Sequence, residues 1–324
     1  MTTTSAITTR GLARAFGEHR AVDGVDLDIA SGEIYGFLGP NGAGKSTTVR
    51  MLCTPLSPSE GTATVAGHDV ATRPHDVRLR IGVALQEAGL SARQTGRETM
   101  ELQAKMYGLR GDTLTRRIDE VVEFVGIGDA IDDMVATYSG GMKRRLDLAT
   151  ALVHEPEIVF LDEPTTGLDP DSRQRVWQEV RRLNSELGVT IFLTTQYLEE
   201  ADQLADRIGI IANGRLAIEG TPDDLKRRVG ADTVTIDLPD HTPDDVDHIN
   251  QLDHVDNTTI DGGQITITTK ASTDVVTAVL TRLANQNRQA ASFAVRGPSL
   301  DDVFLDVTGN RLDTTPTSTT GAEQ

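Results

Sequence analysis

The chain has little cysteine and no long apolar run. Its 324 residues include a single cysteine, Cys53, so no internal disulfide is expected and a reducing compartment is favoured. We interpret this thiol as a packing residue on a helix. No run approaches the roughly 20 apolar residues that a membrane-spanning helix needs, and the first ten residues lack the basic and apolar parts of a secretory signal. The sequence therefore predicts a protein that stays in the cytosol.

Positive charge is also scarce. The chain has 31 Lys and Arg residues against 49 Asp and Glu, which gives a net charge of −18, and only 5 of the basic residues are lysines. Because nucleic-acid binding depends on basic side chains that neutralise phosphates, this balance disfavours a nucleic-acid partner. An Asp-rich, Lys-poor composition fits either a high-salt cytoplasm, where surface charge keeps a protein dissolved, or a GC-rich genome. The sequence leaves these two explanations open.

A glycine-rich segment carries the strongest chemical signal. Residues 39–46 fit the phosphate-loop pattern G-x-x-x-x-G-K-[ST]. Glycines let backbone N–H groups approach phosphate oxygens, and the start of a helix adds the positive end of its dipole. We expect Lys45 to reach the β- and γ-phosphates and the Ser46 hydroxyl to bind Mg²⁺. The apolar run 34–38 and a helix that starts near Lys45 supply the strand–loop–helix context of this motif. The predicted phosphate-binding residues are Gly39, Pro40, Asn41, Gly42, Ala43, Gly44, Lys45 and Ser46.

Two adjacent carboxylates follow another apolar run. Asp162 and Glu163 stand directly after residues 158–161, which read as a buried strand. A carboxylate at the end of such a strand can hold Mg²⁺ through water, and its neighbour can polarise or deprotonate an attacking water. Paired acids are often only a solvated turn, but four apolar residues before them favour a site. The sequence therefore predicts Asp162 as a metal-binding residue and Glu163 as a catalytic residue.

A second anion cradle is predicted upstream of the acid pair. Ser139, Gly140 and Gly141 combine a hydroxyl with backbone N–H groups that open a helix, and three basic residues follow at 143–145. Together with the phosphate loop and the acid pair, this segment resembles the ATP-binding subunits of ABC transporters. The match runs from about residue 12 to residue 225. Tyr138 and Met142 replace the Leu and Gln that are commoner in the family's version of this segment.

The resemblance implies the architecture and the partners. We expect a P-loop NTPase (ABC ATPase) domain that takes ATP and Mg²⁺ as cofactors and works as a head-to-tail homodimer. In that dimer the Ser-Gly-Gly segment (residues 139–141) acts on ATP held by the facing subunit. The resemblance also implies a separate membrane permease as partner and a place on the cytoplasmic face of the cell membrane.

Four further site residues follow from the resemblance. Thr47 is expected to contact the α-phosphate, and Phe16 to stack on adenine, although a core aromatic is the alternative for that ring. Gln86, after the apolar run 81–85, matches the family's switch glutamine, which meets Mg²⁺ and the attacking water. Asp169 falls in a loop that carries signals between the two sites of a dimer.

The chain departs from the family pattern at one position. Most ABC ATPases have a histidine that contacts the γ-phosphate after the strand at 191–195, but this chain has Gln196. An amide can still donate a hydrogen bond, but it cannot become cationic. Hydrolysis is therefore expected to survive at a lower rate, and a low-turnover regulatory module is the alternative. A soluble ABC protein of translation or DNA repair is a third reading, which the single ABC domain and the acidic charge disfavour.

The pattern of strands and helices predicts an α/β fold with two domains. We expect the ABC domain over residues 1–228, with a mostly parallel sheet and a helical subdomain at about 89–153. A small α+β domain follows over 229–312, and the Thr-rich residues 313–324 are predicted to be disordered.

The C-terminal part refines the resemblance. Residues 299–305, Ser-Leu-Asp-Asp-Val-Phe-Leu, and Gln196 are both similar to the daunorubicin-resistance type of ATP-binding subunit. This type implies drug or multidrug export. A capped amphipathic helix is the simpler reading of the segment, and export of lipid, polysaccharide, peptide or ion remains open.

Overall fold

The chain forms two compact units. The computed structural model describes residues 4–84 and 89–309, and the statements below concern those residues. Contacts divide the described residues into one unit that reaches Pro222 and a second that begins at Asp223. Each unit is described by itself. Gln86 and the tail 313–324 lie outside the described residues.

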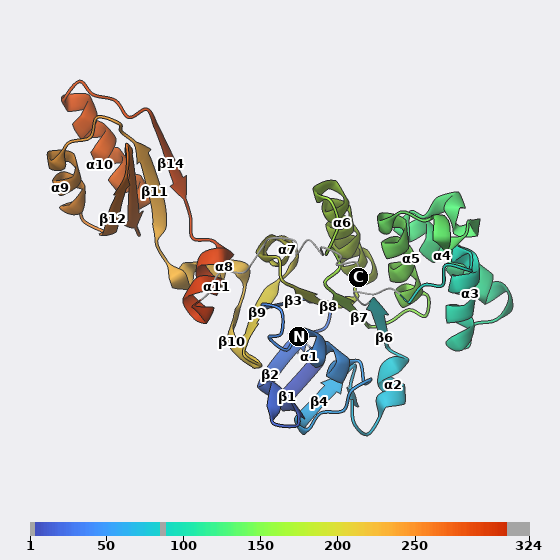
Figure 1. Cartoon of the computed structure of the whole chain (residues 1–324). Coiled ribbons are helices and arrows are strands. Elements are labelled where there is room, and N and C mark those ends of the chain that lie inside the picture. The colour runs from blue at the N-terminus through green and yellow to red at the C-terminus, as the bar shows by residue number, and fades with distance from the viewer. Residues whose placement is uncertain (1–3, 85–88, 310–324) are drawn as a thin grey trace, which may run out of the picture. The chain divides into compact units, whose positions relative to one another are not determined.

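A six-stranded sheet forms the centre of the first unit (Figure 1). Four neighbouring pairs are parallel and one, between β9 and β10, is antiparallel. All five residues of β3 and all six of β8 are buried, as expected for parallel strands covered on both faces. The mostly parallel sheet predicted from the sequence is confirmed. In order across the sheet the strands are β10 (Arg215–Gly220), β9 (Arg207–Ala212), β3 (Ile34–Leu38), β8 (Thr190–Thr195), β7 (Ile158–Asp162) and β6 (Ile81–Ala84).

Aromatic side chains pack at the middle of this sheet. The ring of Phe192 lies 5.5 Å from those of Phe37 and Phe160 and 5.7 Å from that of Tyr35. These four side chains have no exposed surface. The cluster joins three neighbouring strands, so it fixes the part of the sheet from which the site loops leave.

A second, antiparallel sheet was only partly expected. Residues 6–9 and the alternating residues 25–29 have the sequence pattern of short strands, but the structure has a hairpin of two twelve-residue strands. The sheet has the order β2-β1-β4-β5. Register shifts interrupt the pairing of β1 with both β2 and β4, so the apolar alternation that marks a strand is broken. The strands are β1 (Ser5–Phe16), β2 (His19–Ala30), β4 (Glu60–Val65) and β5 (His68–Asp69).

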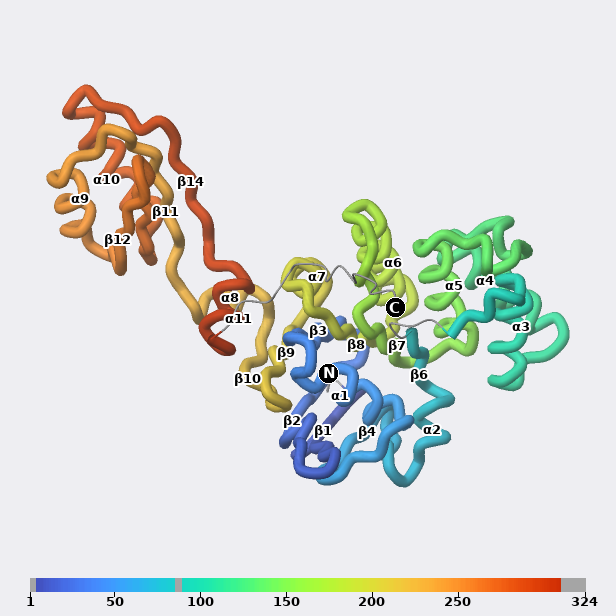
Figure 2. The backbone as a smooth tube through the Cα atoms, in the orientation of Figure 1, coloured from blue at the N-terminus to red at the C-terminus, as the bar shows by residue number. Residues whose placement is uncertain are grey.

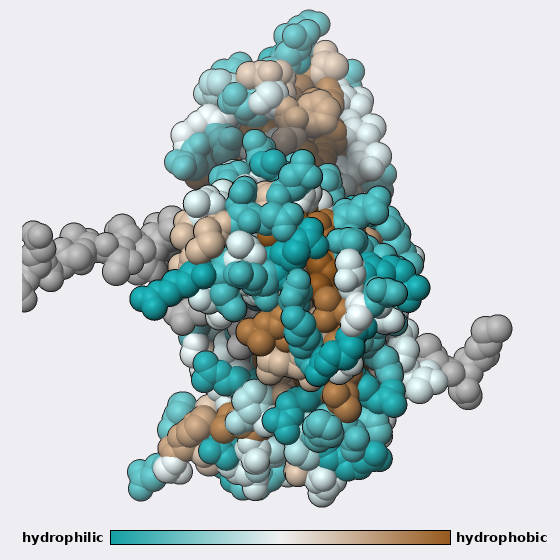
Figure 3. Space-filling view, turned by 90° about the vertical axis from the view of Figure 1, so that its right-hand side faces the viewer, coloured by the Kyte–Doolittle hydropathy of each residue, from teal (hydrophilic) through white to brown (hydrophobic). Residues whose placement is uncertain are grey.

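Helices cover the central sheet. Those that come between β6 and β7 in the sequence form a layer of their own. That layer contains α3, α4 and α5, which share a core with the sheet. Seen from the side that carries α3 and α4, the molecule shows apolar surface between polar side chains (Figure 3). Leu102 and Met106 of α3 are 52% and 74% exposed. The helices are α1 (Lys45–Leu52), α2 (Pro74–Arg78), α3 (Gly96–Met106), α4 (Gly111–Val125), α5 (Gly140–Leu152), α6 (Pro170–Leu187) and α7 (Leu198–Leu204).

The second unit is a four-stranded antiparallel sheet with helices, which confirms the α+β expectation. Its strand order is β12-β13-β11-β14, and the core is formed by the sheet, α10 and Ile249 of α9. Ser299 caps α11 and exchanges hydrogen bonds with Asp302, as the capped-helix reading expected. The elements are α8 (Pro222–Val229), β11 (Asp232–Asp237), α9 (Pro243–Asn250), β12 (Val255–Asp261), β13 (Gln264–Thr269), α10 (Ser272–Asn285), β14 (Ser292–Arg296) and α11 (Leu300–Thr308).

Within residues 4–84 and 89–309, no helix is long and apolar enough to cross a membrane. The longest, α6, has 18 residues, and its sequence is rich in charge. Cys53 directly follows α1 and is buried, so it packs in the interior as expected.

Candidate nucleotide-binding and hydrolysis site

Three of the predicted site segments lie at the carboxyl ends of strands in the central sheet. The phosphate loop follows β3, Asp162 ends β7, and Gln196 follows β8. In the register of the sheet, Leu38 lies beside Thr195 and Asp162 beside Thr194. Because β3, β8 and β7 are parallel neighbours, their carboxyl ends meet. Three stretches that are far apart in sequence are thereby brought together.

Two glycines of the phosphate loop have no room for a side chain. A Cβ on Gly39 would lie 2.5 Å from the carbonyl oxygen of Ile211, and one on Gly44 would lie 2.5 Å from that of Ala21. Gly44 also has a φ of 110°, which disfavours other residues. The loop therefore requires glycine at both positions, and α1 begins at the next residue.

The side chain of Lys45 folds back over the phosphate loop. Its ammonium donates to the carbonyl oxygens of Gly39 at 2.7 Å and Pro40 at 3.2 Å, and it lies 3.4 Å from Oε1 of Glu163. The side chain is only 4% exposed. Burial lowers the Lys45 pKa, and the charges of Glu163 and Asp162 oppose that effect. The ammonium is thus held at the point where the loop and the acid pair meet.

Oxygen atoms suited to Mg²⁺ gather beside the loop. The Ser46 hydroxyl lies 3.5 Å from Oδ1 of Asp162, and the Thr194 hydroxyl donates to the same carboxylate oxygen. Asp162 is 6% exposed. Hydroxyl and carboxylate oxygens are the donors that Mg²⁺ prefers, so the residues fit this ion.

Glu163 is held in an unusual backbone conformation. Its φ is 48°, a left-handed value that costs a non-glycine residue about 1–3 kcal/mol and is typical of functional sites. The backbone N–H donates to the carbonyl oxygen of Thr194 at 3.0 Å, and the Thr166 hydroxyl donates to Oε2 at 3.2 Å. The first contact holds the Glu163 backbone, and the second orients its carboxylate.

One cavity of about 550 Å³ collects most of the predicted site. Its walls include residues 40–42 and 44–46 of the phosphate loop, Thr47, Glu163, Gln196 and Phe16, but not Asp162. Phe16 is 49% exposed, which excludes the core-aromatic alternative, and the guanidinium of Arg14 lies 4.8 Å from its ring centre. His19, Ala21 and Thr166 also line this cavity. Sequence analysis gave none of them a role: His19 and Ala21 lie in no motif, and Thr166 lies in the loop for which only Asp169 was singled out.

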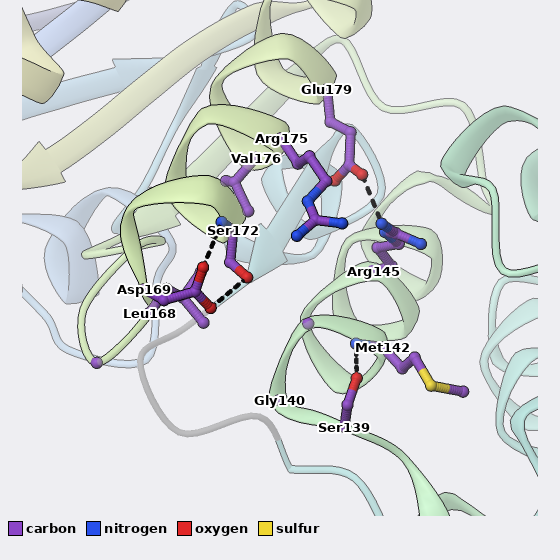
Figure 4. Close-up of a pocket in the computed structure, with 12 residues that line it drawn as sticks. Ser139, Gly140, Met142, Arg145, Leu168, Asp169, Ser172, Arg175, Val176 and Glu179 are labelled. Carbon is purple, nitrogen blue, oxygen red and sulfur yellow. Dashed lines mark hydrogen bonds and ion pairs between the residues drawn. The ribbon is translucent and has the colours of Figure 1, made fainter.

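A second cavity, of about 500 Å³, contains the other anion cradle (Figure 4). It is lined by Ser139, Gly140 and Gly141 and by Asp169, but by no residue of the phosphate loop. The Ser139 hydroxyl accepts from the N–H of Met142 at 3.2 Å and so caps α5. The structure thus separates the predicted nucleotide-binding residues into two places.

Side chains of α6 complete the second cavity. Asp169 caps α6 and accepts from the N–H of Ser172 at 2.9 Å and from its hydroxyl at 2.6 Å, and these hydrogen bonds lower the Asp169 pKa. Arg145 pairs with Glu179 at 3.1 Å, and the guanidinium of Arg175 projects from α6 toward α5 (Figure 4). The lining thus holds two guanidinium groups and two carboxylates, so the N-terminus of α5 with its N–H groups, rather than a net charge, suits this cavity to an anionic ligand.

Behind the cradle, α5 buries an ion pair. Nη1 of Arg144 lies 3.1 Å from Oδ2 of Asp147, and the two side chains are 14% and 10% exposed. Burial raises the Asp147 pKa to about 6, although the charge of Arg144 opposes the rise. The folded state therefore binds a proton that the unfolded chain has released between about pH 4 and pH 6. This contribution to stability is present at low pH and is lost as the pH rises through 6.

We expect Asp147→Asn to remove that pH dependence. The free energy of unfolding of the variant, relative to the unchanged chain, should rise by about 1 kcal/mol between pH 5 and pH 8. Urea unfolding at pH 5, 6, 7 and 8, followed by the fluorescence of Trp177, measures the difference. Two curves that stay parallel over this range would contradict the assignment.

Comparison with known proteins agrees with the geometry. The family described as "ABC transporter" matches residues 22–166, and the family "ATP-binding protein DrrA1-3-like, C-terminal domain" matches residues 220–308. The chain is 43% identical over 324 residues to the daunorubicin/doxorubicin resistance ATP-binding protein DrrA of Streptomyces peucetius, covering 99% of this chain and 98% of that protein. It is 36% identical over 304 residues to the linearmycin resistance ATP-binding protein LnrL of Bacillus subtilis, covering 93% and 97%.

Solved structures show the same fold. The structure of cbiO1 from Clostridium perfringens, part of the ABC transporter complex cbiONQ, has a TM-score of 0.65 and 26% identity, covering 70% of this chain and 92% of that one. A dimeric bacterial ABC transporter cassette has a TM-score of 0.61 and 25% identity, covering 66% and 98%. The chain therefore belongs to the ABC transporter family, as an ATP-binding subunit whose ATP hydrolysis drives transport.

Proposed function

We propose that the chain hydrolyses Mg²⁺-ATP in the phosphate-loop cavity, with Glu163 as the general base. The observation that carries this proposal is the single cavity shared by the phosphate loop, Glu163 and Gln196. Bound Mg²⁺ supplies positive charge that stabilises the transferring phosphoryl group. The steady-state turnover of Glu163→Gln is the direct test of the base.

The other predicted residues take roles that their positions support. The glycine N–H groups and Lys45 bind the β- and γ-phosphates, Thr47 binds the α-phosphate, and Phe16 stacks on adenine. Ser46 and Asp162 hold the metal, and Gln86 joins them on the strength of the family resemblance.

In this proposal, the side chain at position 196 determines the rate of ATP hydrolysis. An amide donates a neutral hydrogen bond to the γ-phosphate, whereas an imidazolium donates a charge-assisted one that is stronger by about 1–2 kcal/mol. We expect Gln196→His to raise kcat roughly five- to thirtyfold, and more at pH 6 than at pH 8 because the imidazole is charged at the lower pH. Initial rates at saturating ATP over this range measure the effect. An unchanged kcat would show that position 196 does not meet the phosphate.

A head-to-tail dimer explains the second cavity. Ser139 caps the N-terminus of α5, whose first residues are Gly140 and Gly141, and the N–H groups at such a helix end are suited to phosphate. They do not line the phosphate-loop cavity, so we propose that they bind the nucleotide held by a second copy. A solved cassette of the same fold is dimeric.

Sedimentation velocity tests the dimer. Glu163→Gln with Mg²⁺-ATP should sediment as a dimer, with twice the chain mass of 34.9 kDa, because the bound ATP is not consumed. Lys45→Ala, which weakens phosphate binding, and Ser139→Tyr, which fills the cradle, should remain monomeric. Molar salt is included because the net charge of −18 opposes association. A monomer of Glu163→Gln under all conditions would exclude the proposal.

We further propose that the chain sits on the cytoplasmic face of the membrane and docks on a separate permease. The apolar surface on the side of α3 supports a protein contact there (Figure 3), since exposed apolar patches are typical of interaction sites. Leu102→Glu together with Met106→Glu should release the chain from membrane fractions without lowering ATP turnover of the purified protein.

The transported substrate is proposed to be a hydrophobic drug. Relatives that match almost the whole chain are named for resistance to daunorubicin, doxorubicin and linearmycin. Source cells that lack the chain should accumulate more fluorescent doxorubicin, and the unchanged chain, but not Lys45→Ala, should reverse this. Equal accumulation would favour another substrate such as a lipid, a polysaccharide or an ion. A low-turnover regulatory module is the second candidate, favoured by Gln196.

A further inference from the structure

We propose that Glu200 is a positioning residue for hydrolysis. Its buried carboxylate ties the loop that carries Glu163 to the helix that follows Gln196, and so fixes these two groups relative to each other beside the nucleotide. The inference rests on the proposed function, because it takes Glu163 as the base and Gln196 as a phosphate ligand.

The burial of Glu200 needs an explanation. This residue lies in α7 and has no exposed surface, while the neighbouring Glu199 is exposed. Burying a carboxylate is strongly unfavourable unless hydrogen bonds and charges compensate. An apolar side chain would pack at this position without that cost. The presence of a glutamate at this buried position therefore indicates a role other than packing.

The partners of Glu200 come from segments that are separate in the sequence. Oε1 accepts from the Thr165 hydroxyl at 2.8 Å and from the indole N–H of Trp177 at 3.0 Å. Burial raises the Glu200 pKa, while the hydroxyl of Thr195, the two donors and the charge of Arg144 oppose the rise. Oε2 is buried and makes no hydrogen bond with the described residues. One carboxylate thus connects α7 with α6 and with the loop that follows β7.

The loop that carries Glu163 contacts the Glu200 carboxylate, and the segment that carries Gln196 leads into the helix that contains Glu200. Thr165 is two residues after Glu163, is fully buried, and belongs to the turn in which Thr166 donates to Glu163. On the other side, Gln196 stands between Thr195 and α7. Helices α6 and α7 run next to each other (Figure 2), and the Trp177–Glu200 hydrogen bond joins them. A displacement of Glu200 is therefore transmitted to Glu163 and to Gln196.

Glu200 acts without touching the nucleotide. It is not among the residues that line the phosphate-loop cavity, whereas Glu163 and Gln196 are. A positioning role consequently predicts a change in kcat with little change in the KM for ATP. A purely structural role predicts a loss of stability instead.

The experiment compares Glu200→Gln with Glu199→Gln, a matched change at the exposed neighbour. Gln keeps the shape and one acceptor oxygen but replaces charge-assisted hydrogen bonds by neutral ones. We expect kcat to fall roughly five- to thirtyfold and KM to stay within about twofold. The thermal unfolding midpoint should be unchanged or higher, because a buried charge has been removed. Glu199→Gln should behave as the unchanged chain.

Trp177 gives a spectroscopic signature of the contact. It is the single tryptophan of the chain, and its indole N–H donates to Glu200. The emission spectrum should change in Glu200→Gln and stay constant in Glu199→Gln. Thr165→Val, which removes a hydroxyl donor at nearly constant shape, should reproduce the fall in kcat and provides a second route if Glu200→Gln folds poorly.

Two results overturn the inference. One is turnover of Glu200→Gln and Thr165→Val within twofold of the unchanged chain. The other is a loss of turnover that follows a lower unfolding midpoint in both variants. An inactive unchanged chain, or a Glu163→Gln variant that keeps its activity, instead overturns the proposed function.

Discussion

Glu163→Gln is expected to lower steady-state ATP turnover by at least about 100-fold while Mg²⁺-ATP binding persists. General-base assistance contributes about 10²–10⁴-fold, and an amide cannot accept the proton of the attacking water. Gln has nearly the same shape and can still accept the hydrogen bond from Thr166 that orients Glu163 at 3.2 Å. Phosphate release at saturating ATP and equilibrium nucleotide binding measure the two quantities separately.

The control for this result is Glu199→Gln, an exposed glutamate on α7 that does not line the cavity. Each protein is assayed in low and in molar salt, because the chain carries a net charge of −18. Activity in molar salt alone would identify the acidic composition as an adaptation to salt. Unreduced turnover of Glu163→Gln would exclude Glu163 as the base, and ATP binding without turnover in either salt would favour the regulatory module.

Phe192→Ala is expected to produce the largest loss of stability. Phe192 has no exposed surface and contacts three other rings of the central sheet, so its removal leaves a cavity between strands that cannot collapse. Substitutions of this kind cost about 3–5 kcal/mol. Thermal and urea unfolding of the full chain measure the change.

The matched control is Phe16→Ala, because that ring is 49% exposed. Its unfolding free energy should fall by less than about 1 kcal/mol. Equal effects of the two substitutions would contradict the placement of Phe192 at the centre of the core.

The elements that the sequence predicted well have strong local signals. Within the helical subdomain predicted at about 89–153, residues 98–107 and 114–125 have the apolar periodicity of amphipathic helices and correspond to α3 and α4, and the apolar run 34–38 is β3. The missed elements lack such signals. Six of the seven residues of β12 carry polar side chains or remain exposed, so no apolar alternation marks it. Only the first part of β1 was predicted, because register shifts and Gly11 interrupt the alternation further along the strand.

The candidate site could be predicted from the sequence where its residues are adjacent in the chain. The phosphate loop, the Ser-Gly-Gly segment and the acid pair each consist of adjacent residues, because a loop that cradles phosphate and a carboxylate at a strand end need only a few neighbours. The roles assigned to these residues stay predictions until the variants are measured.

The sequence by itself determined the family, the α/β class and the local segments that are predicted to bind phosphate. Only the tertiary structure decided which distant residues meet. Strand register places Thr194 beside Asp162, and helix packing brings Glu200 to Thr165 and Trp177. It also separates the Ser139 cradle from the phosphate loop into a different cavity. The physical reason is that register and packing depend on the summed fit of many side chains, which no short segment of the chain encodes.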